Sequence, residues 1–262
     1  IRSLSWACFQ MRFEPGDLQQ YIDDHKAVWP EMQSALVACG WHNYSLFLRE
    51  DGFAVGYFET DVDFKTACAR MDKHGVNDRW QEAMKKYTPA SVSPVDAASE
   101  LKHYFYLGGD RCMVRDGTIP APPFDAAWKP QSYTGGGGRT RAGRRRICFQ
   151  MQFAPTALDQ HLKEQERVSP EQQKALIECG WHNCSLFYRE DGLAVGFVEC
   201  DADFKTVRTR TDAFEVCKRW QEAMAKYTPA IVGGPVEAAC ELTHYFYLGS
   251  DVAQPDAAGV SS

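Results

Sequence analysis

The sequence contains two copies of one long segment. Residues from Cys8 onward align with residues from Cys148 onward at a constant offset of 140, with 49 identities in the first 83 aligned positions. Solenoid and propeller repeats recur about every 20–50 residues, so a period this long indicates that a whole domain has been duplicated. We therefore expect two domains of one fold, residues 1–107 and residues 145–249, which pair within the chain.

The composition limits the kinds of partner. Of the 262 residues, 44% are hydrophobic and 24% charged, as in ordinary globular domains. The formal net charge of −6 argues against nucleic acid or an anionic membrane as a partner. The sequence has no run that approaches the roughly 18 apolar residues of a membrane span. We therefore expect neither nucleic acid nor membrane as a partner.

Each repeat shows the same order of strand and helix patterns. In the first repeat, helical spacing extends over Gly16–Gly40, and Pro30 is expected to divide it because proline lacks the backbone N–H and clashes one turn back. Asp51-Gly52, between two β-prone runs, predicts a hairpin turn. The expected strands are Trp6–Phe13, Trp41–Leu48, Phe53–Glu59 and His103–Leu107, and the second helical region is Asp61–Tyr87, broken near Gly75.

This βαββαβ order is typical of the ferredoxin-like fold, an antiparallel sheet with both helices on one face. The predicted fold class is therefore α+β. The other face of each sheet needs a cover, so we expect the two domains to pack sheet to sheet as a dimeric α+β barrel; further oligomerisation stays open. Residues 108–144 are rich in Gly, Pro and Arg and are expected to be a flexible linker, and residues 250–262 a disordered tail.

The ten cysteines match neither a disulfide framework nor a zinc site, because no CxxC motif occurs. Cys8 and Cys39 lie inside apolar runs and recur in the second repeat. Buried free thiols are typical of a reducing compartment, so we expect a cytoplasmic protein. The histidines stand singly rather than at the short paired spacings of metal ligands, so we expect no metal site.

The two repeats differ most over residues 14–32, which keep 6 of 19 identities against 43 of 64 elsewhere. In that stretch Tyr21, His25 and Trp29 follow one another at four-residue spacing and therefore share one helix face. The second repeat replaces them by His161, Gln165 and Ser169. Histidine exchanges protons near neutral pH, tyrosine offers a hydroxyl and tryptophan a flat apolar surface, a combination that suits a sugar. The spacing alone also fits a plain amphipathic helix, but the loss of all three residues favours one working copy and one structural copy.

A wider set of motifs resembles the L-rhamnose mutarotase family. These motifs are Tyr21-x-x-x-His25-x-x-x-Trp29-Pro30-Glu31, His42-Asn43-Tyr44, Arg79-Trp80 and Glu100-Leu101 with Phe105-Tyr106-Leu107. The resemblance covers residues 5–107 and recurs, weakened, over residues 145–248. It implies a dimeric α+β barrel enzyme that interconverts the α and β anomers of L-rhamnopyranose without metal or cofactor.

The resemblance also assigns roles to residues. It implies that His25 is the proton donor and that Tyr21, Tyr44 and Trp80 bind the sugar. Trp29 joins the binding residues through its place on the same helix face. Gln81 stands where the family has a second tryptophan, which leaves the exact sugar open.

The expected function is therefore an aldose mutarotase, an isomerase that acts on L-rhamnose or a related 6-deoxy sugar. Opening and closing a hemiacetal ring requires acid–base catalysis and no nucleophile. Two alternatives stay open: a sugar-binding or regulatory protein without turnover, and a cofactor-free monooxygenase of the same architecture. The second domain is expected to have little or no activity, with His161 as the alternative acid.

Overall fold

The computed structural model describes residues 5–87, 99–108, 111–114, 117–119, 144–227 and 240–249. The chain divides into two compact units. Unit 1 comprises residues 1–100, 136–142 and 244–262, and unit 2 comprises residues 101–135 and 143–243. Both units combine helices with antiparallel strands, so the fold class is α+β as predicted. The predicted tail, residues 250–262, lies outside the described residues.

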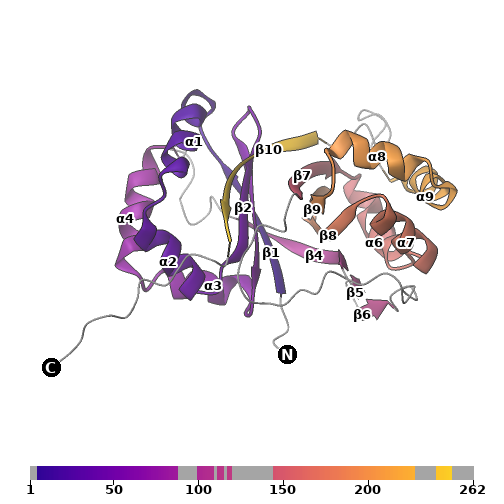
Figure 1. Ribbon diagram of the computed structural model, residues 1–262, viewed down its shortest axis with the longest axis horizontal. Coiled ribbons are helices and arrows are strands. Elements are labelled where there is room, and N and C mark those ends of the chain that lie inside the picture. The colour runs from indigo at the N-terminus through magenta and orange to yellow at the C-terminus, as the bar shows by residue number, and fades with distance from the viewer. Residues whose placement is uncertain are drawn as a thin grey trace. The chain divides into compact units, whose positions relative to one another are not determined.

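Unit 1 follows the order of strands and helices predicted for the first repeat, except that its last strand comes from the second repeat. Its strands are β1 (Ser5–Arg12), β2 (His42–Leu48), β3 (Phe53–Thr60) and the end of β10 (Cys240–Leu248). Its helices are α1 (Leu18–Lys26), α2 (Pro30–Ala38), α3 (Phe64–Met71) and α4 (Gly75–Met84), with short 3₁₀ turns at Pro15–Asp17 and Lys85–Tyr87. The four helices lie along one face of the strands (Figure 1).

The break between α1 and α2 confirms the predicted effect of Pro30. Trp29 has an extended backbone, with φ −57° and ψ 135°, and Pro30 is the first residue of α2. Proline is tolerated there because the first turn of a helix leaves its N–H groups without intrahelical partners. Trp29 therefore sits at a fixed corner between two helices.

The hairpin between β2 and β3 also confirms the sequence prediction. Gly52 has a φ of +85°, and a Cβ at this position would lie 2.1 Å from the carbonyl oxygen of Phe13. Only glycine fits this turn. β3 pairs antiparallel with both β1 and β2, and a β-bulge interrupts the second pairing between His42 and Ser45.

Unit 2 repeats this plan with the second copy of the sequence. Its strands are β7 (Arg145–Gln152), β8 (Trp181–Tyr188), β9 (Leu193–Cys200) and most of β4 (Ser99–Gly108). Its helices are α6 (Leu158–Gln165), α7 (Pro170–Glu178), α8 (Phe204–Asp212) and α9 (Glu215–Ala225), preceded by a 3₁₀ turn at Pro155–Ala157. β9 pairs antiparallel with both β7 and β8.

The last strand of each repeat belongs largely to the unit built by the other repeat. In β4, Lys102–Leu107 pairs antiparallel with β8 of unit 2. In β10, the residues from His244 onward belong to unit 1, where β10 lies next to β2. The compact units therefore differ from the repeat boundaries at residues 107 and 145, because each sheet gains a strand from the other copy.

Part of the predicted linker is also structured. The strands β5 (Arg111–Val114) and β6 (Gly117–Ile119) continue the sheet of unit 2 beyond β4. Cys112 is fully buried in the core of that unit. The remainder of residues 108–144, apart from Gly108 and Arg144, lies outside the described part of the chain.

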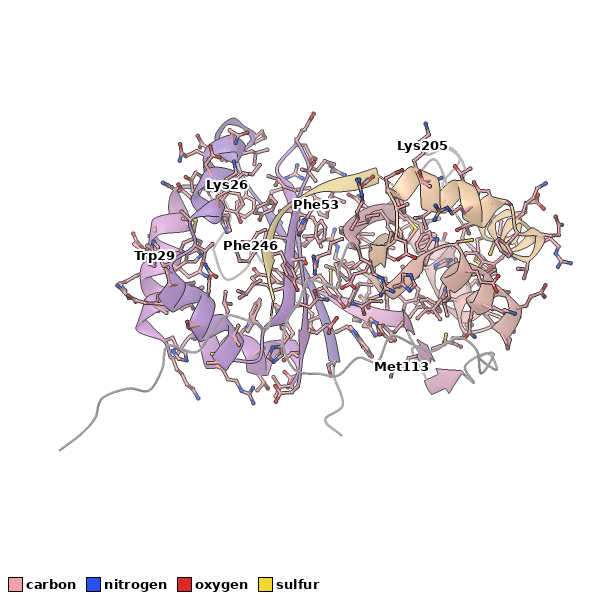
Figure 2. The ribbon with its side chains drawn as sticks, viewed as in Figure 1. Lys26, Trp29, Phe53, Met113, Lys205 and Phe246 are labelled. Atoms are coloured by element: carbon pink, nitrogen blue, oxygen red, sulfur yellow. The ribbon has the colours of Figure 1, made fainter. Side chains whose placement is uncertain are left out.

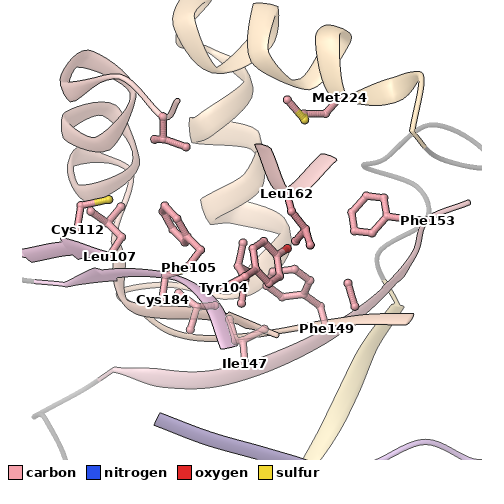
Figure 3. Packing of buried hydrophobic residues seen from close by; sticks show 14 of the residues in the cluster. Tyr104, Phe105, Leu107, Cys112, Ile147, Phe149, Phe153, Leu162, Cys184 and Met224 are labelled. Carbon is pink, nitrogen blue, oxygen red and sulfur yellow. The ribbon is translucent and has the colours of Figure 1, made fainter. Parts of the chain in front are cut away.

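Each unit has its own hydrophobic core between its helices and its strands. In unit 1 the core joins Phe9 and Phe58 from the sheet to Met32 and Leu36 of α2. In unit 2 the equivalent core includes Tyr104, Phe149 and Phe153, drawn in Figure 3. Among the described residues, no helix is both long and apolar enough to cross a membrane.

Candidate active site in unit 1

Helix α1 places Tyr21 and His25 one turn apart, and both side chains are buried. The Nδ1 atom of His25 lies 2.9 Å from the backbone carbonyl oxygen of Tyr21. A carbonyl oxygen only accepts hydrogen bonds, so Nδ1 carries a proton and donates it. In the neutral imidazole the other nitrogen, Nε2, is therefore an acceptor with a free lone pair.

The protonation state of His25 is set mainly by burial. Burial lowers the pKa of His25 below its ordinary value of 6.5, and the hydrogen bond to Tyr21 and the charge of Asp24 oppose this only in part. The imidazole is therefore neutral at neutral pH, which makes Nε2 a proton acceptor at rest and a donor after it has been protonated.

Aromatic rings surround this histidine. The ring of Tyr21 lies 4.3 Å from the His25 ring, centroid to centroid, and Trp80 of α4 lies 5.4 Å away in an edge-on arrangement. Tyr245 and Phe246 of β10 lie 5.5 Å and 6.0 Å away. The imidazole is therefore held among flat apolar surfaces with little freedom to rotate.

Trp29 extends the site at the corner between α1 and α2. Its ring packs edge-on against Trp80, with centroids 5.3 Å apart. The guanidinium carbon of Arg79 lies 5.7 Å from the centroid of the Trp29 ring, and Arg79 pairs with Glu31 at 2.6 Å. Trp29 is only half-buried, so part of the residue is exposed to solvent.

Tyr44 reaches the same group of side chains from β2. The bulge before it uses Asn43 in a left-handed conformation, with φ 48°, and the Asn43 amide donates to Glu59 at 2.9 Å. Asparagine tolerates this conformation better than most residues, which explains its place before Tyr44. The Tyr44 ring then packs against Phe246, with centroids 5.6 Å apart. Burial raises the pKa of Tyr44 well above its ordinary value, so the hydroxyl keeps its proton.

Two residues of this site were missed by the sequence analysis, Tyr245 and Phe246. The Tyr245 hydroxyl donates to the Tyr21 hydroxyl at 3.0 Å, and burial raises the pKa of both groups. In Figure 2, Phe246 points from β10 toward the helices of unit 1. The motif His-Tyr-Phe-Tyr-Leu occurs at residues 103–107 and 244–248, so the residue types were visible in the sequence, but the unit that each strand joins was not.

The structure does not bring Gln81 into this group. The side chain is exposed, and its nitrogen lies 3.4 Å from the side-chain oxygen of Asn77. The group around His25 therefore consists of Tyr21, Trp29, Tyr44, Trp80, Tyr245 and Phe246. In the described part of the chain, no cluster of three His, Cys, Asp or Glu side chains is arranged to hold a metal ion.

The equivalent positions of unit 2 have a different chemistry. His161 takes the place of Tyr21 and stacks on Phe153, with centroids 3.9 Å apart. Gln165 takes the place of His25 and is buried. Ser169, in the place of Trp29, caps α7 by accepting a hydrogen bond from the backbone N–H of Gln172 at 3.1 Å. At this position the second copy therefore has an N-cap side chain, which Trp29 does not provide for α2.

Comparison with known proteins links both repeats to one family. A family model described as L-rhamnose mutarotase matches residues 7–107 and, separately, residues 146–248. The L-rhamnose mutarotase of Listeria monocytogenes serotype 4b (strain F2365) is 31% identical over 97 residues, which cover 37% of this chain and 92% of the relative. The L-rhamnose mutarotase of Escherichia coli (strain K12) is 32% identical over 102 residues, which cover 38% of this chain and 94% of the relative.

Solved structures resemble the whole chain rather than one repeat. A putative monooxygenase from Fusobacterium nucleatum matches with a TM-score of 0.53 and 7% identity, covering 94% of each chain. A putative monooxygenase from Lactobacillus acidophilus NCFM matches with a TM-score of 0.52 and 8% identity, covering 95% of this chain and 97% of the other. At such low identity this likeness concerns the fold alone.

Proposed function

Since the chain belongs to the L-rhamnose mutarotase family, we propose that unit 1 interconverts the α and β anomers of L-rhamnopyranose or a related 6-deoxy sugar. The proposal makes the protein an aldose mutarotase, an isomerase with one active copy. The observation that carries it is the position of His25, which is buried among aromatic side chains. Its Nδ1 is fixed to a carbonyl oxygen, and its Nε2 is the nitrogen that exchanges a proton.

The reaction divides into ring opening and ring closure. In opening, the anomeric hydroxyl loses a proton, the bond between the anomeric carbon and the ring oxygen breaks, and the ring oxygen gains a proton. Neutral His25 takes the first proton on Nε2, and the resulting imidazolium gives this proton to the ring oxygen as the bond breaks. After the open-chain aldehyde has rotated, the hydroxyl formed from the ring oxygen returns its proton to Nε2 and attacks the other carbonyl face, and the imidazolium then protonates the carbonyl oxygen, which becomes the new anomeric hydroxyl. His25 therefore acts as proton donor in each half, the role that the family resemblance implies.

The tyrosines supply hydrogen bonds rather than protons. Their pKa values are raised by burial, so Tyr21, Tyr44 and Tyr245 remain neutral hydroxyls that donate to and accept from sugar oxygens. Trp29 and Trp80 offer ring faces or edges to the C–H surface of the sugar. Gln81 remains a proposed binding residue only through its position in the family motif, since its side chain is exposed and contacts Asn77.

The experiment that tests this proposal is saturation-transfer NMR between the two anomeric protons of L-rhamnose. We expect fast exchange with the wild type and a loss of about 10²–10⁴-fold in rate with His25→Gln, the size of one general acid–base group. Gln is the residue that the second repeat carries at this position, so its side chain is compatible with the fold. The matched control is Gln165→His in unit 2, which is expected to leave the rate unchanged.

An unchanged rate in His25→Gln would remove His25 from the reaction. Loss of the rate in His161→Phe instead would move catalysis to unit 2. No acceleration of exchange by the wild type, with any 6-deoxy sugar, would leave sugar binding without turnover as the function.

We also propose that the two repeats pack sheet to sheet within one chain, in the manner of a dimeric α+β barrel. Two observations support this: the exchange of β4 and β10 between the units, and the likeness of the whole chain to single solved chains. A chain that sediments as an active 29.6 kDa monomer would agree with this pairing. Activity confined to an assembly of two chains would contradict it. Nine of the ten cysteines, all except Cys240, are free thiols in the structure, which supports a reducing, cytoplasmic location.

A further inference from the structure

Unit 2 contains a cavity at the position that corresponds to the active site of unit 1. Its wall includes His161, Gln165, Cys184 and Trp220, the counterparts of Tyr21, His25, Tyr44 and Trp80. The cavity has a volume of about 160 Å³. An engineered cavity of about 150 Å³ in another protein takes up benzene, so the space in unit 2 holds one six-membered ring.

The wall of this cavity is mostly aromatic and aliphatic. Phe149 and Phe204 line it and stack on each other with centroids 5.0 Å apart, and Met151, Leu176 and Trp181 add to the apolar surface. The charged side chain on the wall, Arg208, lies over the Phe204 ring, 5.5 Å from its centroid, and is half-buried. A pyranose, which carries a hydroxyl on most of its ring carbons, has too few partners in such a space, whereas a flat hydrocarbon ring fits it.

A small group of polar atoms in this wall lacks partners. The hydroxyl of Tyr104, both ring nitrogens of His161 and Oε1 of Gln165 are buried and accept or donate no hydrogen bond within the described residues. Tyr104, His161 and Gln165 are each at most 3% exposed. Unpartnered buried polar groups cost free energy. These atoms have almost no accessible surface in the free protein, so a ligand pairs with them once a side chain turns its polar atom toward the cavity. The free-energy cost of the unpaired atoms favours such a turn when a ligand supplies the missing partner.

The protonation of these groups defines the complementary ligand. Burial lowers the pKa of His161 to about 4, so its imidazole is neutral and presents one donor and one acceptor. Burial also raises the pKa of Tyr104, which keeps a hydroxyl that donates and accepts. A neutral hydroxyl on the ligand therefore finds both kinds of partner at this end of the cavity.

We propose that the cavity of unit 2 binds a small aromatic molecule that carries a hydroxyl group, a phenol. The ring lies between the apolar side chains, and the hydroxyl bonds to His161, Tyr104 or Gln165. The second repeat is then a binding domain for a ligand chemically unlike the sugar of unit 1. The inference does not depend on the function proposed for unit 1.

The test is calorimetric titration of the full chain with phenol, with toluene as the probe that lacks the hydroxyl. We expect one phenol per chain, not displaced by excess L-rhamnose. His161→Phe, which keeps a ring stacked on Phe153, and Gln165→Leu are each expected to weaken phenol binding about tenfold while toluene binding is unchanged. Tyr21→Phe, the matched change in unit 1, is expected to leave phenol binding unchanged.

A second readout identifies the site without any change of sequence in the cavity. With methyl-labelled methionine, phenol is expected to shift the NMR signals of Met151 and Met224, which line the cavity, and not that of Met32 in unit 1. Displacement of phenol by L-rhamnose, unchanged phenol affinity in both variants, a shift confined to Met32, or no binding of phenol at all would each overturn the proposal.

Discussion

Tyr245 and Tyr104 occupy equivalent positions in the last strands of the two repeats, and their hydroxyl groups have opposite surroundings. The Tyr245 hydroxyl donates to Tyr21 at 3.0 Å. The Tyr104 hydroxyl is buried and has no hydrogen-bond partner among the residues that the structure describes. We therefore expect Tyr245→Phe and Tyr104→Phe to change the free energy of unfolding in opposite directions.

The size of each effect follows from these contacts. Tyr245→Phe removes one hydrogen bond and leaves the Tyr21 hydroxyl, which is 3% exposed, without its donor. Loss of one partner of a buried pair costs about 1–3 kcal/mol. Tyr104→Phe removes a polar atom whose burial is uncompensated, so a gain of about 1 kcal/mol is expected. Double replacement of Tyr21 and Tyr245 by phenylalanine should cost less than the two single changes together, because neither hydroxyl is then left alone.

Urea unfolding followed by far-UV circular dichroism measures these differences. Four variants, namely Tyr104→Phe, Tyr21→Phe, Tyr245→Phe and the double replacement of Tyr21 and Tyr245, are compared with the wild type at one pH and without ligand. Equal destabilisation by Tyr245→Phe and Tyr104→Phe would refute the reasoning, since the two residues would then contribute only packing. Additive effects in the double variant would refute the direct contact between β10 and α1.

Two further predictions concern proton transfer and packing in unit 1. Burial lowers the pKa of His25 below 6.5. We therefore expect kcat/KM for mutarotation to stay level through neutral pH and to fall as the pH drops through that lowered pKa, because Nε2 then becomes protonated. A value of kcat/KM that rises on acidification would contradict the role of His25 as a base. A Cβ on Gly56 would lie 2.2 Å from the ring of Phe9, whereas none of the surrounding atoms lies within 4 Å of a Cβ on Gly16. Gly56→Ala is therefore expected to lower the free energy of unfolding by about 1–3 kcal/mol. Gly16→Ala is the control in the same urea titration and is expected to leave the free energy of unfolding nearly unchanged. Equal urea midpoints for the two variants would show that the Phe9 ring moves aside without cost.

Much of the fold was predictable because the signals are local. Pro30 separates two helices because its ring removes the backbone N–H and clashes with the preceding turn. Gly52 marks a turn in which a side chain would clash with the backbone. The four-residue spacing of Tyr21 and His25 is enough to place them on one helix face, whatever the tertiary contacts. The resemblance added Tyr44 and Trp80, and the structure brings both toward His25.

The part of the site that depends on long-range contacts was not predictable in the same way. The hydrogen bond from His25 Nδ1 to the Tyr21 carbonyl depends on a rotamer, and the rotamer is fixed by rings from α4 and β10. The bulge that carries Tyr44 depends on Asn43 meeting Glu59 across the hairpin. None of these contacts has a fixed spacing in the sequence.

The sequence by itself determined the duplication and the order of strands and helices. It also showed that the second copy lacks counterparts of His25 and Trp29. The tertiary structure decided which unit each final strand completes, and so placed Tyr245 and Phe246 beside His25 and Tyr104 beside His161. The physical reason is that strands pair through backbone hydrogen bonds, which are the same for any sequence. Two strands that both read His-Tyr-Phe-Tyr-Leu therefore carry no local signal that assigns them to one sheet or the other.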